Sequence, residues 1–349
     1  MSSSVAAWDI HAHGLPQSVL DSLEASGEEW GATLKAVGSN RVIEFASGER
    51  TAPIREDMVD LDARLRRMDA AHVTGQVVAP WIDLTAYHLD ARRGAGFSRL
   101  VNEKLAGMVS SVPDRLLGLA TVPLQDPELA AVELHHAVVE LGMVGVQIGT
   151  TVAGRDLHDP GLDVFWKTAE QLRCIVLVHP HQFGLAGRSE SPYFMGNLIG
   201  NPSESTVAIG SLLFGGVLER FSELTIVSVH GGGFVPWQAG RWEHAYDVMP
   251  ELVGGRLAKP PSEYLSRIYF DTVLHDPRSI EHLISWAGAD RVVLGSDYPF
   301  PMGDSDPVAT VESVSGLDAP TREAIVRGNL DSLIARVRRA PPPAEPRVS

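Results

Sequence analysis

The segment WDIHAHGLP, residues 8–16, carries two histidines two positions apart at the end of a short apolar run. Side chains of an extended strand alternate between its faces, so His11 and His13 point the same way, with Asp9 one step below them. Two imidazoles on one face can bind one metal ion, because imidazole is a common metal ligand. Single His-x-His pairs also occur on surfaces and in hydrogen-bonded cores, so the rest of the chain has to decide between these roles.

Seven further apolar, β-branched runs follow the first one. Stretches with helical spacing lie between most of them, among them residues 60–71, 129–142, 163–173 and 277–288. Near-continuous apolar runs are typical of parallel strands covered on both faces, and alternating strands and helices indicate βαβ units. Eight such units predict an α/β fold, the (β/α)8 TIM barrel. The eight runs are residues 6–13, 75–80, 116–123, 143–150, 174–180, 224–231, 268–273 and 291–297.

The remaining segments are expected to be loops and insertions of one domain over residues 1–338. The largest insertion, about residues 14–56, is polar and glycine-rich and could form a small flap over the barrel mouth. A second irregular stretch, residues 181–201, follows the fifth run. Residues 339–349 are rich in proline with little apolar material, which predicts a disordered tail.

Composition limits the classes of partner. The chain has 349 residues, of which 44% are hydrophobic and 21% charged, as is usual for soluble globular proteins. Its net charge of -15 disfavours nucleic acids and acidic membranes as partners, because both require a basic face. The sequence has neither a signal-peptide pattern nor an apolar run of membrane-spanning length. Cys174 is the single cysteine, so we expect a buried thiol and a cytoplasmic protein.

The polar residues of interest fall at the ends of the predicted strands. His11 and His13 end the first strand, His179 the fifth, His230 the sixth and Asp297 the eighth. The carboxyl ends of barrel strands share one face, where catalytic residues gather. Three histidines and an aspartate can bind a divalent ion such as zinc and leave a coordination position open, which favours catalysis over a closed structural zinc site.

The motifs DIHAH, VHP, VHGGG and LGSDYPFPMG resemble those of the amidohydrolase superfamily, specifically the decarboxylase branch typified by aminocarboxymuconate-semialdehyde decarboxylase. Longer stretches, among them LGMVGVQIGT and YFDTVLHDPRSIEHLI, extend the resemblance over nearly the whole chain. The resemblance implies a carboxy-lyase without an organic cofactor. Its metal ligands would be His11, His13, His179 and Asp297, and His230 and Asp297 would be the catalytic residues.

The resemblance also implies how many ions bind. Binuclear members of the superfamily carry a bridging carboxylated lysine after the fourth strand. Here that strand ends VQIGTTVAGR, which contains no lysine. We therefore expect one divalent ion per chain, most readily zinc, with manganese as the alternative.

The expected substrate is a small anionic acid, resembling either aminocarboxymuconate semialdehyde or a hydroxybenzoate. In relatives of this branch an arginine eleven residues after the HGGG histidine enters the neighbouring subunit's site, which implies a homodimer with Arg241 acting in trans. A second substrate arginine is assigned to Arg50, with Arg55 as the other candidate.

Two further residues are candidate substrate contacts. They are Phe300 in the last motif and His181, which stands where the close decarboxylases have tryptophan. Because His181 departs from that pattern, the identity of the substrate stays open. The same groups could hydrolyse an amide, ester or lactone, or hydrate a double bond. A non-catalytic metal-binding module is the alternative from a different class of protein.

Overall fold

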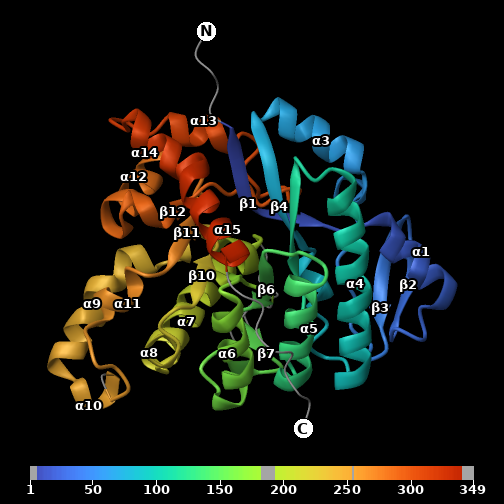
Figure 1. The fold of residues 1–349 in the computed structure, drawn as a ribbon, viewed down its shortest axis with the longest axis horizontal. Helices are drawn as coiled ribbons and strands as arrows, with labels where there is room; N and C mark the ends of the chain where they lie inside the picture. Colours follow the sequence, from blue (N-terminus) through green and yellow to red (C-terminus); the bar gives the residue numbers. More distant parts are fainter. Residues whose placement is uncertain (1–5, 182–192, 254, 340–349) are drawn as a thin grey trace.

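The computed structural model describes residues 6–181, 193–253 and 255–339. Eight parallel strands form one sheet that curls into a barrel, and helices surround it (Figure 1). The predicted TIM barrel is confirmed, with sheet order β1-β4-β5-β6-β9-β10-β11-β12. The strands are β1 (Ala7–Gly14), β4 (Val73–Pro80), β5 (Leu116–Ala120), β6 (Gly145–Gly149), β9 (Ile175–His179), β10 (Thr225–Ser228), β11 (Tyr269–Asp271) and β12 (Val292–Val293).

The barrel closes between its first and last strands. β12 is only two residues long, but the chain after it continues alongside β1. The amide of Ile10 donates a hydrogen bond to the carbonyl of Leu294 at 2.9 Å, and that of Asp297 donates to His11 at 2.7 Å. The amide of His13 then donates to the carbonyl of Tyr298 at 2.7 Å. These bonds place Asp297 directly beside the two histidines of β1, although 284 residues separate it from His13 in the sequence.

The predicted helices occur within a few residues of their expected ends. Asp60, Asp126 and Asp276 each precede a helix and accept a hydrogen bond from a backbone N–H of its first turn, which explains where those helices begin. The longer helices around the barrel are α3 (Leu61–Ala70), α4 (Ala91–Ser111), α5 (Pro127–Val139), α6 (Asp163–Leu172), α7 (Asn201–Phe214), α9 (Val235–Val248), α12 (Pro277–Ala287) and α15 (Asn329–Arg339).

Shorter elements lie in the connections. They are the hairpin of β7 (Thr151–Val152) and β8 (Arg155–Asp156), and the helices α8 (Val217–Arg220), α10 (Pro250–Val253), α11 (Pro261–Leu265), α13 (Pro307–Glu312) and α14 (Ala319–Glu323). Of the second irregular stretch, residues 182–192 lie outside the described part of the chain. A π-helical turn over Gly196–Gly200 leads directly into α7.

The insertion after β1 is a packed unit rather than a loose loop. It contains α1 (Gln17–Ser26), the antiparallel hairpin of β2 (Ala32–Val37) and β3 (Asn40–Phe45), and α2 (Glu56–Val59). Figure 1 shows α1 and the hairpin beside α4. Buried Leu20 and Phe45 of the insertion belong to one apolar cluster with Trp81 and Phe97 of the barrel. Its few apolar residues are enough to fix it against the barrel wall.

The structure also bears on the predictions made for Cys174, for membrane spans and for the tail. Cys174 is buried immediately before β9, as expected, and burial raises the pKa of its thiol to about 12. Among the described residues, no helix combines the length and the hydropathy that a membrane span requires. The predicted tail falls almost entirely on residues 340–349, which lie outside the described part. The division into one domain of residues 1–338 and a tail stays a prediction.

Candidate metal centre and active site

Four imidazoles and one carboxylate converge at the carboxyl end of the barrel. His11 and His13 come from β1, His179 from the end of β9, and His230 follows β10 by two residues. The Nε2 atoms of His11 and His13 each lie 3.2 Å from Oδ1 of Asp297, and that of His179 lies 3.9 Å from the same oxygen. The alternation of β1 explains the pair, since residues 11 and 13 share the inward face.

Hydrogen bonds to the other ring nitrogen turn each Nε2 toward Asp297. Nδ1 of His179 lies 2.7 Å from the carbonyl oxygen of Pro180, and Nδ1 of His13 lies 3.5 Å from that of Pro80. Nδ1 of His11 lies 2.6 Å from Oδ2 of Asp271. Such bonds fix the tautomer and the ring orientation of metal-ligating histidines.

The atoms that meet at the centre have no hydrogen-bond partner among the described residues. Buried polar atoms without a partner are costly and uncommon, so this concentration indicates a ligand for them. Ligand atoms that share one divalent ion at about 2.0–2.2 Å lie roughly 3–4 Å apart when a further coordination position stays open, and the distances of 3.2 and 3.9 Å fall in that range. Three imidazoles and a carboxylate therefore fit a divalent ion. The unpartnered atoms are Nε2 of His11, His13 and His179, and Oδ1 of Asp297.

The geometry also offers a second ligand set. Ligand atoms of His11, His179, His230 and Asp297 all lie within 4.8 Å of one another, so His230 could replace His13. However, Nε2 of His230 lies 3.6 Å from Oδ2 of Asp297, whereas the other three rings face Oδ1. This difference separates His230 from the three histidines that share one oxygen.

Asp271 is a functional residue that the sequence analysis missed. Besides binding His11, its carboxylate accepts hydrogen bonds from the amides of Gly231 at 2.8 Å and Val273 at 3.3 Å. One buried side chain therefore holds a metal ligand and the two segments that follow β10 and β11. The available signal was its position in YFDTV, two residues before the end of the seventh predicted strand, as Asp297 ends the eighth.

A second buried carboxylate supports the site from below. Asp9 accepts hydrogen bonds from the hydroxyl of Ser296 at 2.5 Å and the amide of Gln76 at 2.8 Å, and also from the backbone amide of His11. Gln76 in turn accepts a bond from the buried guanidinium of Arg64, which also donates to the carbonyl oxygen of His13. This network ties β1, β4 and the segment after β12 together beneath the metal ligands.

The carboxylates make the centre favourable for positive charge. Burial lowers the pKa of His11, but Asp297 and Asp271 outweigh that effect and raise it to about 10. Burial opposes ionisation of Asp297, yet the surrounding imidazoles hold its pKa well below the usual range. For His179, burial dominates and lowers the pKa to about 3.

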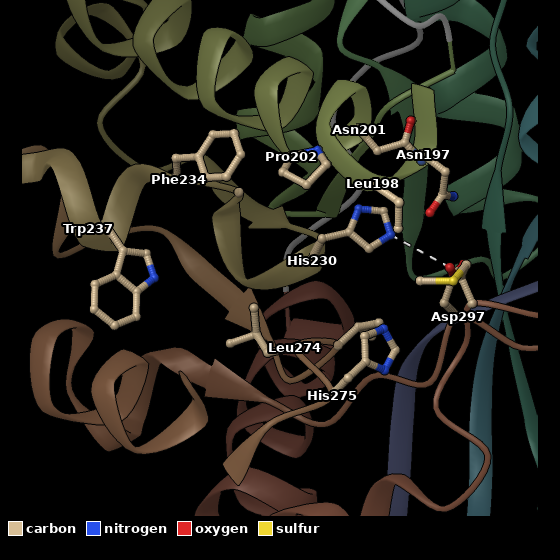
Figure 2. Close-up of a pocket in the computed structure, with 13 residues that line it drawn as sticks. Asn197, Leu198, Asn201, Pro202, His230, Phe234, Trp237, Leu274, His275 and Asp297 are labelled. Carbon is tan, nitrogen blue, oxygen red and sulfur yellow. Dashed lines mark ion pairs between the residues drawn. The ribbon is translucent and has the colours of Figure 1, made fainter. Parts of the chain in front are cut away.

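His230 lies where the site opens into a cavity. Its backbone is left-handed, with φ of 54°, and three glycines with positive φ follow it. A Cβ at Gly233 would collide with the carbonyl oxygen of Pro202, so the chain approaches α7 more closely than other residues allow. The cavity has a volume of about 340 Å³, near the small end for ligand sites, and suits a compact molecule. Figure 2 shows His230 and Asp297 on its wall.

The structure places one predicted substrate contact, Phe300, beside a candidate metal ligand, and the other, His181, against Gly149 and Tyr87. The ring of Phe300 lies 5.1 Å from that of His13. His181 packs against Gly149, where a Cβ would collide with its ring, and lies 5.4 Å from the ring of Tyr87. Burial lowers the pKa of His181 to about 4, and its Nδ1 has no partner within the described ranges.

The predicted arginines lie outside this cluster. Arg50, in the segment after β3, pairs with Glu44 of β3, and Arg55 pairs with Asp57 through two nitrogens. Within the described residues, neither arginine forms a hydrogen bond or ion pair with the candidate metal ligands. Arg241 is exposed on α9, and no ion pair joins it to another described residue. The subunit itself thus brings none of these arginines to the histidines.

Comparison with known proteins identifies the family. The amidohydrolase family model matches residues 8–329, so the chain belongs to the amidohydrolase family. The 2-amino-3-carboxymuconate-6-semialdehyde decarboxylase of Dictyostelium discoideum is 31% identical over 322 residues, covering 92% of this chain and 89% of that protein. The chain therefore falls in the decarboxylase branch that the sequence motifs indicate.

Two further relatives extend this result. A gamma-resorcylate decarboxylase from a Rhizobium species is 27% identical over 278 residues, which is 73% of this chain and 82% of that protein. The structure of a dihydroxybenzoic acid decarboxylase from a Polaromonas species, solved with bound manganese, superposes with a TM-score of 0.75 at 21% identity. The match covers 95% of this chain and 97% of the other, and at this identity it supports the fold alone.

Proposed function

We propose that this protein is a metal-dependent decarboxylase of a small unsaturated or aromatic carboxylic acid. The observation that carries the proposal is the convergence of three imidazoles on one oxygen of Asp297, beside the cavity that His230 lines. None of these four ligand atoms has a hydrogen-bond partner among the described residues. The whole-length similarity to decarboxylases supports this reaction over hydrolysis or hydration.

His11, His13, His179 and Asp297 would hold one ion. A bound divalent ion supplies a Lewis acid that polarises a substrate oxygen. Zinc suits the histidine-rich ligand set, and manganese, which the Polaromonas enzyme holds, is the other candidate. The ring of His181 packs against Gly149 at the end of β6, so a histidine lies near the place where binuclear relatives carry a lysine, which supports a single ion.

His230 would deliver the proton that replaces carbon dioxide. When the carboxylate leaves, its bonding electrons stay on the substrate carbon, and a proton must reach that carbon. His230 lines the cavity, its side chain is 15% exposed, and imidazole exchanges protons near neutral pH. The Asp271–Gly231 hydrogen bond fixes the backbone beside it, so the ring is held in place before substrate binds.

The reaction assignment is tested by the products. Metal-loaded protein should release one carbon dioxide per molecule of acid consumed from a panel that includes 2-amino-3-carboxymuconate 6-semialdehyde and 2,6-dihydroxybenzoate. Matched amides, esters and lactones, monitored for ring opening or alcohol release, should remain unchanged. Consumption of these compounds without carbon dioxide release from any acid would make the protein a hydrolase.

We assign the substrate contacts within the subunit to His181 and Phe300. Phe300 offers a ring edge beside His13, and His181 offers an unpartnered nitrogen from the end of β9. Arg50 would have to leave Glu44 to reach a substrate, and Arg55 would have to leave Asp57. We retain Arg50 as the proposed substrate arginine of the insertion, with Arg55 as its alternative.

No nucleic acid or membrane partner is proposed, and we place the enzyme in the cytoplasm.

The substrate's carboxylate would also bind Arg241 of a second subunit in a homodimer. Phe234, Trp237, Arg241 and Val248 recur at spacings of three, four and seven residues at the start and along the length of α9, and all are exposed. Trp237 and Phe234 also line the cavity (Figure 2). An unpaired arginine within an apolar stripe at the mouth of the site suits a two-fold interface that completes that site.

Mixing two inactive variants tests the role of Arg241. Arg241→Ala should weaken the binding free energy of the substrate carboxylate by about 2–5 kcal/mol if the contact is desolvated. After subunit exchange with His230→Ala, half of the dimers are mixed, and each contains one intact site. Activity should therefore return to roughly a quarter of wild type. Mixing His11→Ala with His230→Ala should restore nothing, because both residues serve their own subunit. No recovery with Arg241→Ala despite proven exchange would confine Arg241 to its own subunit.

A further inference from the structure

His275 is a histidine of the cavity that the proposed reaction does not use. It follows β11 and lines the same cavity as His230 and Asp297. The rings of His230 and His275 both extend toward the part of the cavity that Asp297 lines (Figure 2). Sequence analysis missed it because nothing but its place after the seventh strand distinguishes it from surface histidines.

The backbone at His275 shares an uncommon conformation with the two functional residues nearby. His230, His275 and Asp297 have φ of 54°, 60° and 58°, and they follow the adjacent strands β10, β11 and β12. Left-handed conformations are uncommon for residues other than glycine and cluster at functional sites. In each case a left-handed residue two to four positions after the strand carries a polar side chain that lines the cavity.

The segment that carries His275 is held on both sides. Before it, the amide of Val273 donates to Asp271, and that of Leu274 donates to the carbonyl of Thr272 at 2.7 Å. After it, Asp276 caps the start of α12. The carboxylate that holds His11 thus also holds this segment, so the position of His275 is coupled to that of the metal ligands.

The ring of His275 is free to bind a ligand. No hydrogen bond or ion pair joins it to another residue in the described ranges, and it is exposed. Its neighbours on the cavity wall, Val273, Leu274 and Met302, are apolar. In ligand sites a few polar groups set in apolar walls determine orientation and specificity.

We propose that His275 is a specificity-determining residue that hydrogen-bonds a second oxygen-bearing substituent of the substrate, a hydroxyl or a carboxylate remote from the carboxylate that leaves. The inference rests on the proposed function and narrows its substrate class to acids with two polar groups on one small frame. Apolar side chains near His275 would pack against the frame, and His275 would select its substituent.

Binding of unreacted acids tests this role without turnover. The dissociation constants of benzoate, 3-hydroxybenzoate, 2,6-dihydroxybenzoate and benzene-1,3-dicarboxylate are measured by calorimetry on metal-loaded protein. Wild type should bind at least one disubstituted acid about 10- to 100-fold more tightly than benzoate, the factor expected of one charge-assisted hydrogen bond. The hydroxyl and dicarboxylate members show which substituent is preferred.

Two substitutions and a matched control complete the test. His275→Phe keeps a ring without hydrogen bonds, and His275→Asn keeps a polar group that tolerates left-handed backbone. The increment is the factor by which the disubstituted acid binds more tightly than benzoate. The phenylalanine variant should lose the whole increment while it binds benzoate normally, and the asparagine variant should keep part of the increment. His72→Ala should change nothing, because His72 also has a positive φ, of 55°, but lies at the amino end of β4.

The possible failures are distinguishable. If wild type shows the increment and His275→Phe keeps it, the assignment of His275 is wrong while the proposed function stands. If His275→Phe weakens the binding of benzoate and of the disubstituted acids equally, the assignment is also wrong, because the residue would then only shape the cavity. If metal-loaded wild type binds none of these acids and releases no carbon dioxide from any acid of the panel, the proposed function itself fails.

Discussion

Replacing His230 with Asn or Ala is expected to lower kcat about 10²- to 10⁴-fold, the usual worth of a positioned general acid. Its Nε2 faces Oδ2 of Asp297 rather than the oxygen that the other histidines share, and its Nδ1 has no partner in the described structure. The ring is therefore available to hold and release a proton. Asn is the informative variant because it tolerates the left-handed backbone at this position.

The measurement is steady-state release of carbon dioxide together with the unfolding temperature. A purely structural role would lower the unfolding temperature and reduce activity only in proportion to folded protein. His72→Ala controls for the loss of a left-handed histidine elsewhere in the barrel. Near-normal turnover by folded His230→Asn would show that another group supplies the proton.

Removing the metal with a chelator is expected to abolish activity and destabilise the fold. Without an ion, three imidazole nitrogens and an oxygen of the ionised Asp297 remain buried without a hydrogen-bond partner among the described residues. Activity should return on addition of one equivalent of zinc or manganese per chain. At a free-ion concentration 1,000 times the dissociation constant, the ion should stabilise the native state by about 4 kcal/mol.

Thermal unfolding across a metal titration checks this prediction independently of the substrate. The unfolding temperature should rise until one equivalent of metal is bound and should then increase with free metal as mass action requires. The double variant His11→Ala, His13→Ala should show no metal-dependent rise. Full activity after exhaustive chelation, or a break at two equivalents, would contradict the assignment of one essential ion.

The fold and the convergence of the histidines with Asp297 could be predicted because they depend on short-range patterns. Strands covered on both faces must be apolar, so the eight runs were visible, and alternation placed His11 and His13 on one face. Parallel strands in a barrel bring their carboxyl ends together, which predicted that His179 and Asp297 would join the pair. These conclusions required no knowledge of loop conformation.

The supporting and substrate-binding residues could not be predicted in the same way. The role of Asp271 depends on its Oδ1 accepting hydrogen bonds from two backbone amides while its Oδ2 contacts His11, and the sequence does not specify that geometry. The role of His275 depends on a left-handed turn that follows β11. The packing of the insertion could not be predicted for a third reason, since its few apolar residues pack with Trp81 and Phe97, which are distant in the sequence.

Metal content of two single variants tests the central claim most directly, namely that His11, His13, His179 and Asp297 hold the ion and leave His230 for proton transfer. His13→Ala and His230→Ala are loaded with zinc, passed over a desalting column and analysed for metal per folded chain. The account predicts that His230→Ala retains one equivalent and that His13→Ala loses most of it. Retention by His13→Ala with loss from His230→Ala would establish the other ligand set that the geometry permits and contradict the account.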